Sequence, residues 1–409
     1  ALAEKGGVLR RRQDLPDDAF LCITELKASG CPQDSLPLAM VSAPWLTTKS
    51  PDPRGHSLKI VARALKILID DGKRRAKRQP QRWGVIWDFA SLHQFTNIAF
   101  EGEPIWERTA EEEALFTRGL TAWGALFAHQ HITVLRVTKM PPSYPAGYVV
   151  DASTNTSDVA DRGWMYAELM WSRLIKWHWD LVYDLGKLSG KEMDKADLMK
   201  SCCKIEECTA PMMPAEMTSA LQEKSFANVQ RDRPLVERLY ADVFTRMMRR
   251  TRALHYTSLR WGDEEAKQLC LLFKSGALSR LEALHLCGNR FGDVGLNALA
   301  EIVKCRALPL LSSITVDRPN QFDLRKACDA MEVDLQKQDL CEPKAISPLR
   351  TNVSPLRTGV SPMRNGLDSS RGPLSERPAA SRVVGGPAPR MLSYTVPPLS
   401  ERGGARSMR

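Results

Sequence analysis

The chain has 409 residues and a formal net charge of +10, with 43% hydrophobic and 26% charged residues. This length suits two or three domains, and no apolar run approaches the roughly 20 residues of a membrane-spanning helix. Residues 1–7 lack the apolar stretch of a secretory signal. The ten cysteines are scattered, which argues against a disulfide framework and favours a reducing compartment. We therefore expect a cytoplasmic protein with no membrane anchor.

Strands and helices alternate in the first half of the chain. Apolar runs predict strands at 36–42, 83–87, 132–137 and 181–185, and periodicity predicts helices at 57–71, 109–129 and 161–179. Gly72 is the expected end of the first helix, and Thr109-x-x-Glu112 is a capping box that starts the second. After a flexible lead-in over 1–30, we predict an α/β domain over 31–186. Its parallel flavodoxin-like sheet should carry helices on both faces.

Two further stretches each have an ordinary structural explanation and a functional alternative. The basic run 73–78 is either a solvated connection or a nuclear-import signal, which would place the protein in the nucleus. Residues 187–250 are predicted to be a helical connector that ends in an amphipathic helix over 232–248. A cysteine cluster in this connector lacks a fourth zinc ligand, so we predict no metal site there. Its members are Cys202, Cys203 and Cys208.

Beyond residue 250 the sequence repeats every 30 residues. Leu254-His255-Tyr256 aligns with Leu284-His285-Leu286 and then with Ile314-Thr315-Val316. The unit Leu281-x-x-Leu284-x-Leu286-x-x-Asn289, followed by an apolar helix, resembles a leucine-rich repeat of the ribonuclease-inhibitor-like class. We expect its leucines to point inward and Asn289 to hydrogen-bond the backbone of the turn. The sequence thus predicts a small α/β repeat block over 251–330, docked on the preceding helix.

The positive charge is concentrated in a predicted disordered tail over 331–409. Residues 344–409 hold eleven basic residues against three acidic ones and are rich in Pro, Ser and Gly. Three Ser-Pro-x-Arg units repeat every seven residues, and we regard their serines as candidate phosphorylation sites, although incidental Ser-Pro pairs stay an alternative. These serines are Ser347, Ser354 and Ser361. The tail has one aromatic residue, Tyr394, so base stacking is scarce and nucleic-acid binding is not favoured.

Three fragments of the predicted α/β domain bring polar and aromatic residues to its strand ends. They are Ser42-x-x-Trp45, Asp88 with Gln94, and Arg162-x-Trp164-x-x-x-Glu168, with Glu107-Arg108 between the second and the third. Their order and spacing resemble the fungal heterokaryon-incompatibility (HET) domain. The Trp-x-x-x-Glu spacing is also similar to that of the TIR domain. The resemblance covers residues 35–185 and implies a TIR/HET-like fold.

This resemblance implies two functions. In the first, the protein is an intracellular signalling or scaffold protein, whose α/β domain self-associates into a homo-oligomer and whose repeats bind a protein partner. In the second, it is an enzyme that cleaves the nicotinamide–ribose bond of NAD. Glu168 would then be the catalytic carboxylate. Ser42, Trp45, Asp88 and Trp164 would line the NAD pocket, and no other cofactor is implied.

Each of these residues also has an ordinary structural explanation. Trp164 shares a helical stripe with Trp171 and Leu174, so it can equally belong to the core. Glu168 can be a solvated surface residue, and Asp88 can cap the end of a strand. Whether the protein is an enzyme therefore stays open at the level of the sequence.

Overall fold

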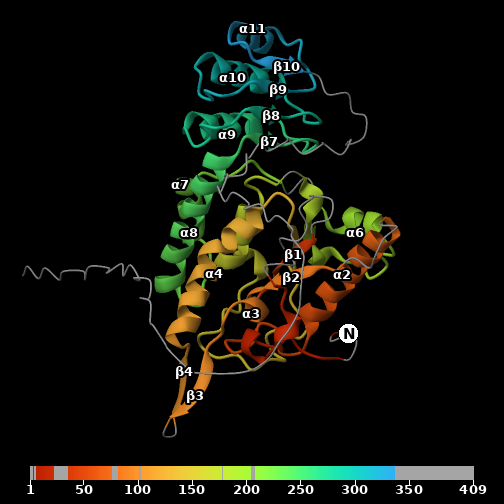
Figure 1. The fold of residues 1–409 in the computed structure, drawn as a ribbon, viewed down its shortest axis with the longest axis vertical. Helices are drawn as coiled ribbons and strands as arrows, with labels where there is room; N and C mark the ends of the chain where they lie inside the picture. Colours follow the sequence, from red (N-terminus) through yellow and green to blue (C-terminus); the bar gives the residue numbers. More distant parts are fainter. Residues whose placement is uncertain are drawn as a thin grey trace, which may run out of the picture. The chain divides into compact units, whose positions relative to one another are not determined.

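The computed structural model describes residue 3 and residues 6–22, 36–75, 82–100, 103–176, 178–203 and 208–336 (Figure 1). These residues all lie in one compact unit, 1–348. They form ten α-helices, two four-stranded parallel sheets and one two-stranded antiparallel hairpin. The prediction of an α/β protein is therefore confirmed. The serines of the Ser-Pro-x-Arg units lie outside the described residues.

The first sheet contains the four strands that the sequence predicts for the α/β domain. They are β1 (Leu38–Ser42), β2 (Gly84–Trp87), β5 (Thr133–Arg136) and β6 (Val182–Asp184). The strand order is β2-β1-β5-β6, and every neighbouring pair is parallel. Because parallel strands need crossover connections, helices have to cover the faces of this sheet.

One face of the first sheet packs against three helices from distant parts of the chain. They are α4 (Ala110–Ala128), α5 (Gly163–Ser172) and α8 (Val229–Arg250). The register partners Met40, Val134 and Val182 join one buried cluster with Phe127 and Trp171 of these helices. Helix α4 begins at the predicted capping box, which is present with both of its hydrogen bonds.

The opposite face packs against α2 (His56–Arg75) and α6 (Lys195–Cys202). Val41, Leu135 and Tyr183 occupy neighbouring strands on this face and form a second buried cluster with Val61 and Leu198. Adjacent residues of each strand thus point to opposite faces, and both faces are buried. This burial explains why the strands appear in the sequence as continuous apolar runs.

Two predicted helix ends are wrong. Helix α2 does not stop at Gly72 but continues to Arg75, so the first part of the run 73–78 is helical and residues 76–78 lie outside the described part. The helix predicted over 161–179 ends at Ser172. The chain then turns, and the buried Lys176 amine donates to the carbonyls of His129 and Ile132, both at 2.8 Å. The apolar stripe continues beyond the helix because this turn is itself buried.

Two elements were not predicted: the hairpin formed by β3 (Thr96–Phe100) and β4 (Glu103–Glu107), and the short helix α3 (Asp88–Ser91). The available signal was the pair Glu101-Gly102 between two short runs with apolar residues, which is typical of a tight hairpin. The lead-in also contacts the domain, because Gln13 exchanges hydrogen bonds with the Gln94 backbone at 2.5 and 3.1 Å. Residues 6–22 of the predicted flexible segment are therefore anchored next to α3.

The segment predicted as a connector contributes to the core of the α/β domain. It contains α6, α7 (Pro214–Gln222) and α8. Helix α8 packs on both α4 and α5. Its side chains Val236, Tyr240 and Phe244 belong to the same buried cluster as the first sheet. No described helix is both long enough and apolar enough to cross a membrane.

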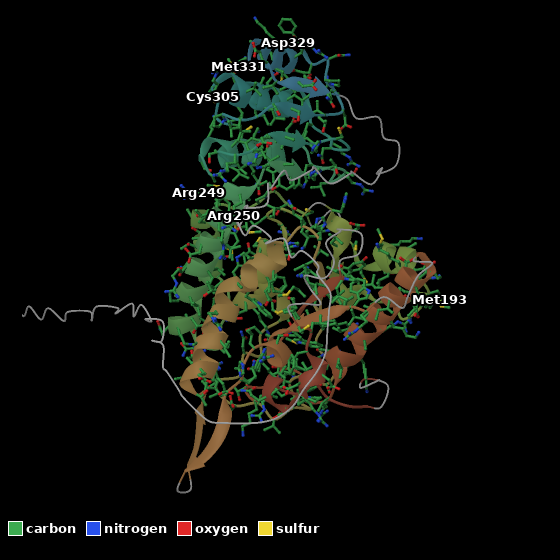
Figure 2. All side chains as sticks on the ribbon, viewed as in Figure 1. Met193, Arg249, Arg250, Cys305, Asp329 and Met331 are labelled. Atoms are coloured by element: carbon green, nitrogen blue, oxygen red, sulfur yellow. The ribbon has the colours of Figure 1, made fainter. Side chains whose placement is uncertain are left out.

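The second sheet is a parallel ladder whose first three strands pair with a 30-residue register, whereas the last strand pairs with an offset of 21 residues. Its strands are β7 (Ala253–His255), β8 (Ala283–His285), β9 (Ser313–Thr315) and β10 (Asp334–Gln336). Helices α9 (Asp263–Lys274), α10 (Asp293–Lys304) and α11 (Phe322–Ala330) stack beside them (Figure 1). Cys305 and Met331, labelled in Figure 2, follow α10 and α11 and lie on the same side of this stack. The sheet extends to Gln336, six residues beyond the predicted end of the repeats at 330.

Asn289 has the predicted role in the turn after β8. Its side-chain oxygen accepts hydrogen bonds from the amides of Leu259 and Trp261, at 3.2 and 3.1 Å. Its side-chain nitrogen donates to the carbonyls of Tyr256 and Leu286, at 2.7 and 2.8 Å. One amide group thereby satisfies four backbone groups in two successive turns.

The repeats are joined to the first sheet by apolar packing and by two buried hydrogen bonds. Tyr256 donates its hydroxyl to the Leu174 carbonyl at 2.5 Å, and the indole of Trp261 donates to the Cys208 carbonyl at 2.6 Å. One buried cluster runs from the first sheet through α8 to the helices of the repeats. The two sheets therefore share a continuous core.

Candidate functional site

The candidate site lies at the carboxyl end of the first sheet. From β1 the chain passes to β2 on one side and later to β5 on the other, so the crossovers diverge between β1 and β5. In open parallel sheets, ligands bind at such a point. Ser42 ends β1, Arg136 ends β5, and the two are register partners. The Ser42 hydroxyl also donates to the sulfur of Met165, on the first turn of α5, at 3.8 Å.

Glu168 lies on the second turn of α5 and is buried, with 8% of its surface exposed. The indole of Trp123 donates to Oε1 at 3.1 Å, whereas Oε2 has no hydrogen-bond partner among the described residues. Burial raises the pKa of Glu168 to about 7, although Ser42 and Trp123 act to lower it. Asp88 raises this pKa and Arg136 lowers it, so these charges lie near the carboxyl group.

The first two predicted fragments are joined by a hydrogen bond. Asp88 opens α3, directly after β2, and its Oδ2 accepts a hydrogen bond from the Trp45 indole at 2.6 Å. Its Oδ1 accepts from the Phe89 amide at 2.7 Å. Burial raises the pKa of Asp88, and both hydrogen bonds oppose this effect. The Gln94 side chain donates to the Asp88 carbonyl at 3.2 Å, so the six-residue spacing closes a turn at the strand end.

Arg162 connects the third fragment to the first. It precedes α5, and only 5% of its surface is exposed. Its Nη1 donates to the Trp45 carbonyl at 2.6 Å, and its Nε donates to the Ser157 carbonyl at 2.9 Å. The long segment between β5 and α5 is thereby fixed to the end of β1. All three fragments that resemble the HET domain thus meet at one edge of the sheet.

Trp164 is half-buried and packs against the cluster formed by α4, α5 and α8. It precedes Glu168 by one helical turn. This packing is what the core interpretation expects. The assignment of Trp164 to an NAD pocket stays a prediction.

Two further residues of the site were not singled out by the sequence. Trp123 was assigned only to the buried stripe of its helix, and its indole donates to the Glu168 carboxyl group at 3.1 Å. Arg136 ends an apolar strand and belongs to no motif. Both reach the site through the packing of α4 and the pairing of β1 with β5, which no local pattern specifies.

The chemistry available here is that of two carboxylates with raised pKa values beside a serine, two indoles and two arginines. A carboxyl group whose pKa is about 7 is present in both protonation states near neutral pH, so Glu168 has the property of a general acid or base. The described residues contain no group of three or more His, Cys, Asp or Glu side chains placed to hold a metal ion. Cys202 and Cys208 lie in different buried clusters.

Comparison with known proteins identifies no relative of this chain. The chain matches no protein-family model, no curated protein and no solved structure. The resemblance to HET and TIR domains therefore rests on the quoted motifs and their spacing.

Proposed function

We propose that this protein is a signalling scaffold, in which a TIR/HET-like α/β domain self-associates and leucine-rich repeats bind a protein partner. Numbered within the first sheet, the strand order is 2-1-3-4, which supports a flavodoxin-like fold. The 30-residue register and the bonds of Asn289 support leucine-rich repeats. The proposal takes the protein to be intracellular.

The face of the repeat sheet opposite its helices is the feature that carries this proposal. Leu254, Leu284 and Ile314 are register partners and are buried against the helices. Their strand neighbours must point to the opposite face, because side chains alternate along a strand. Two rows of small or polar side chains result, each in register across the ladder. One row is Ala253, Ala283, Ser313 and Asp334, and the other is His255, His285, Thr315 and Gln336.

Site-specific crosslinking tests this surface. A photoreactive amino acid at the half-buried Ser313, on the face opposite the helices, should capture a protein partner in the cells of origin. The same group at Lys267, on the outer side of α9, is the matched control and should capture none. Equal capture at both positions would overturn the assignment of the surface. Self-association is tested separately by light scattering, in which the mass of the full chain should rise with concentration.

The second candidate function is cleavage of NAD. It is favoured by Glu168, a carboxyl group with a pKa of about 7 that lies near Ser42 and Asp88 at the diverging crossovers. Because Glu168 is 8% exposed, substrate could reach it only after the neighbouring segment opens. A buried carboxyl group that accepts a hydrogen bond can also serve only to hold the fold together, without any catalytic role. The scaffold function therefore stands first.

Release of nicotinamide from NAD distinguishes the two functions. The experiment uses the full chain, because α8 and the repeats complete the core of the first sheet. An NAD-cleaving enzyme loses activity in Glu168→Gln and keeps it in Glu301→Gln, a control at an exposed glutamate of α10. If the folded, self-associated chain releases no nicotinamide, the scaffold function is the only one of the two that remains.

A further inference from the structure

Arg162 is a buried cation with an incomplete set of partners. Its two hydrogen bonds go to backbone carbonyls, which carry no full negative charge. Its Nη2 is buried and has no hydrogen-bond partner among the described residues. Burial lowers the pKa of Arg162, and Tyr144 and Asp158 offset this effect only in part. Burying a guanidinium group without a paired anion is unfavourable.

The amino end of α5 adds positive potential at the same place. Arg162 is the residue that precedes this ten-residue helix. No side chain caps the helix there, and its first turn contains no acidic residue. Helix α4, by contrast, has the capping box of Thr109 and Glu112, and α6 is capped by Asp194. The Gly163 amide already donates to the Ser225 carbonyl at 2.9 Å, so the helix dipole and the following amides of the first turn make this amino end electropositive.

We propose that Arg162 and the amino end of α5 form a binding site for a phosphate group. A guanidinium fork and the N–H groups of a first helical turn are the donors that phosphate oxygens accept best in proteins. A bound phosphate group would supply the negative charge that the buried Arg162 lacks. It lies at the carboxyl end of the first sheet, because Arg162 contacts Trp45 and the first turn of α5 contacts Ser42. The proposal does not depend on either function proposed above.

Entry of phosphate requires the segment between β5 and α5 to shift. This segment supplies Ser157, which accepts from Arg162, and Tyr144, which also interacts with it. Its middle faces solvent, where Val149 is 93% exposed. Long loops that border a site commonly control access to it. We therefore expect phosphate binding to change hydrogen exchange in this segment.

The first test is thermal unfolding of the full chain with inorganic phosphate, pyrophosphate or ADP, at ionic strength matched with sodium chloride. The melting temperature should rise with at least one phosphate compound and not with adenosine. A response to pyrophosphate and ADP alike indicates a free phosphate site, whereas a response to ADP alone indicates a nucleotide site. No response to any of the three compounds would overturn the proposal.

Two substitutions separate binding from a purely structural role. Arg162→Met should abolish the phosphate-dependent increase, and Arg162→Lys should weaken binding about tenfold because lysine lacks the guanidinium fork. Arg173→Met, at the opposite end of α5, is the matched control and should keep the increase. Arg162→Met also loses the hydrogen bonds to Trp45 and Ser157, so its melting temperature without ligand should fall. An increase that persists in a folded Arg162→Met protein would refute the site.

Backbone NMR gives a readout that an altered stability cannot imitate. In the unmodified full chain, the amide resonances of Trp164 and Met165 should shift with phosphate in a saturable way. The amides at the carboxyl end of α5 should stay in place. If only distant amides respond, phosphate binds elsewhere and the proposal is wrong. Neither experiment involves NAD cleavage, so failure here leaves the proposed functions untouched.

Discussion

The indole nitrogen of Trp45 lies 2.6 Å from Oδ2 of Asp88, and this hydrogen bond joins two segments that are 43 residues apart in the chain. Both segments begin where a strand of the first sheet ends. The bond therefore fixes the geometry of the candidate site at the point where β1 and β2 lie side by side.

Removing this hydrogen bond should destabilise the fold. Trp45→Phe leaves the Asp88 carboxylate with one partner fewer, and we expect a loss of about 1–2 kcal/mol in the free energy of unfolding. Urea denaturation measures it. Trp83→Phe is the matched control, because the buried indole nitrogen of Trp83 has no hydrogen-bond partner among the described residues. Equal losses in the two variants would mean that the Trp45–Asp88 bond contributes nothing.

Glu168 should make the protein less stable as the pH rises from about 4.5 to about 7. Its pKa is near 4.5 in the unfolded chain and about 7 in the fold, so the folded state binds more protons in this window. Glu168→Gln should remove the dependence, which amounts to roughly 3–4 kcal/mol for a shift of this size. Unfolding curves at several pH values would show a parallel decline in both proteins if another group were responsible.

Glu192 should have the opposite effect. Burial opposes its ionisation, but hydrogen bonds from the amide and hydroxyl of Ser189 lower the pKa of Glu192 to about 2. The stabilising contribution is present above pH 4.5 and is lost as the pH falls toward 2. In Glu192→Gln, acid unfolding should begin closer to neutral pH and depend less on pH. An unchanged acid transition would contradict this assignment.

The stacked rings of His255 and His285 should make the repeats sensitive to acid. Their centroids are 4.5 Å apart, and burial followed by the charge of His285 lowers the pKa of His255 to about 4. The unfolded chain therefore binds protons first, and stability is lost as the pH falls from 6.5 to about 4. His255→Gln should reduce this loss, measured by hydrogen exchange over β7 and β8. His93→Gln, outside the repeats, is the control and should leave the exchange there unaltered.

Asn289 should be the most sensitive polar residue of the repeats. Asn289→Ala leaves two amides and two carbonyls without their partner, and we expect a loss of about 2–4 kcal/mol. Asn297→Ala is the comparison, since the side chain of Asn297 accepts one hydrogen bond, from Gln321, on the surface. Chemical denaturation should show a much smaller loss for Asn297→Ala. Similar losses would show that water replaces Asn289 at little cost.

The parts of the fold that the sequence predicted are those with a local cause. Strands β1, β2, β5 and β6 are short apolar runs because both faces of their sheet are buried. The start of α4 was predictable because a capping box is a local motif, and the role of Asn289 because it follows the leucines of one repeat unit at the spacing of the turn. The end of α5 was not predictable, since the turn after Ser172 is buried as thoroughly as the helix.

The candidate site was predictable only as far as its motifs extend. Ser42, Trp45, Asp88 and Glu168 were found by spacing, and the structure brings them to one edge of the sheet. Trp123 comes from a helix whose sequence shows only a buried stripe. The position of Arg136 beside Ser42 depends on the order of the strands, which the amino-acid pattern within each strand does not encode.

The continuous core has a consequence for how the protein unfolds. Since the same buried cluster includes Met40 of the first sheet and Leu299 of the repeats, neither part can lose its packing without exposing apolar surface of the other. Heating should therefore produce one calorimetric transition for the described part of the chain, and a cavity created in α10 should lower the melting temperature reported by the first sheet. A protein cut between the two sheets would present this shared surface to water, where it would drive aggregation.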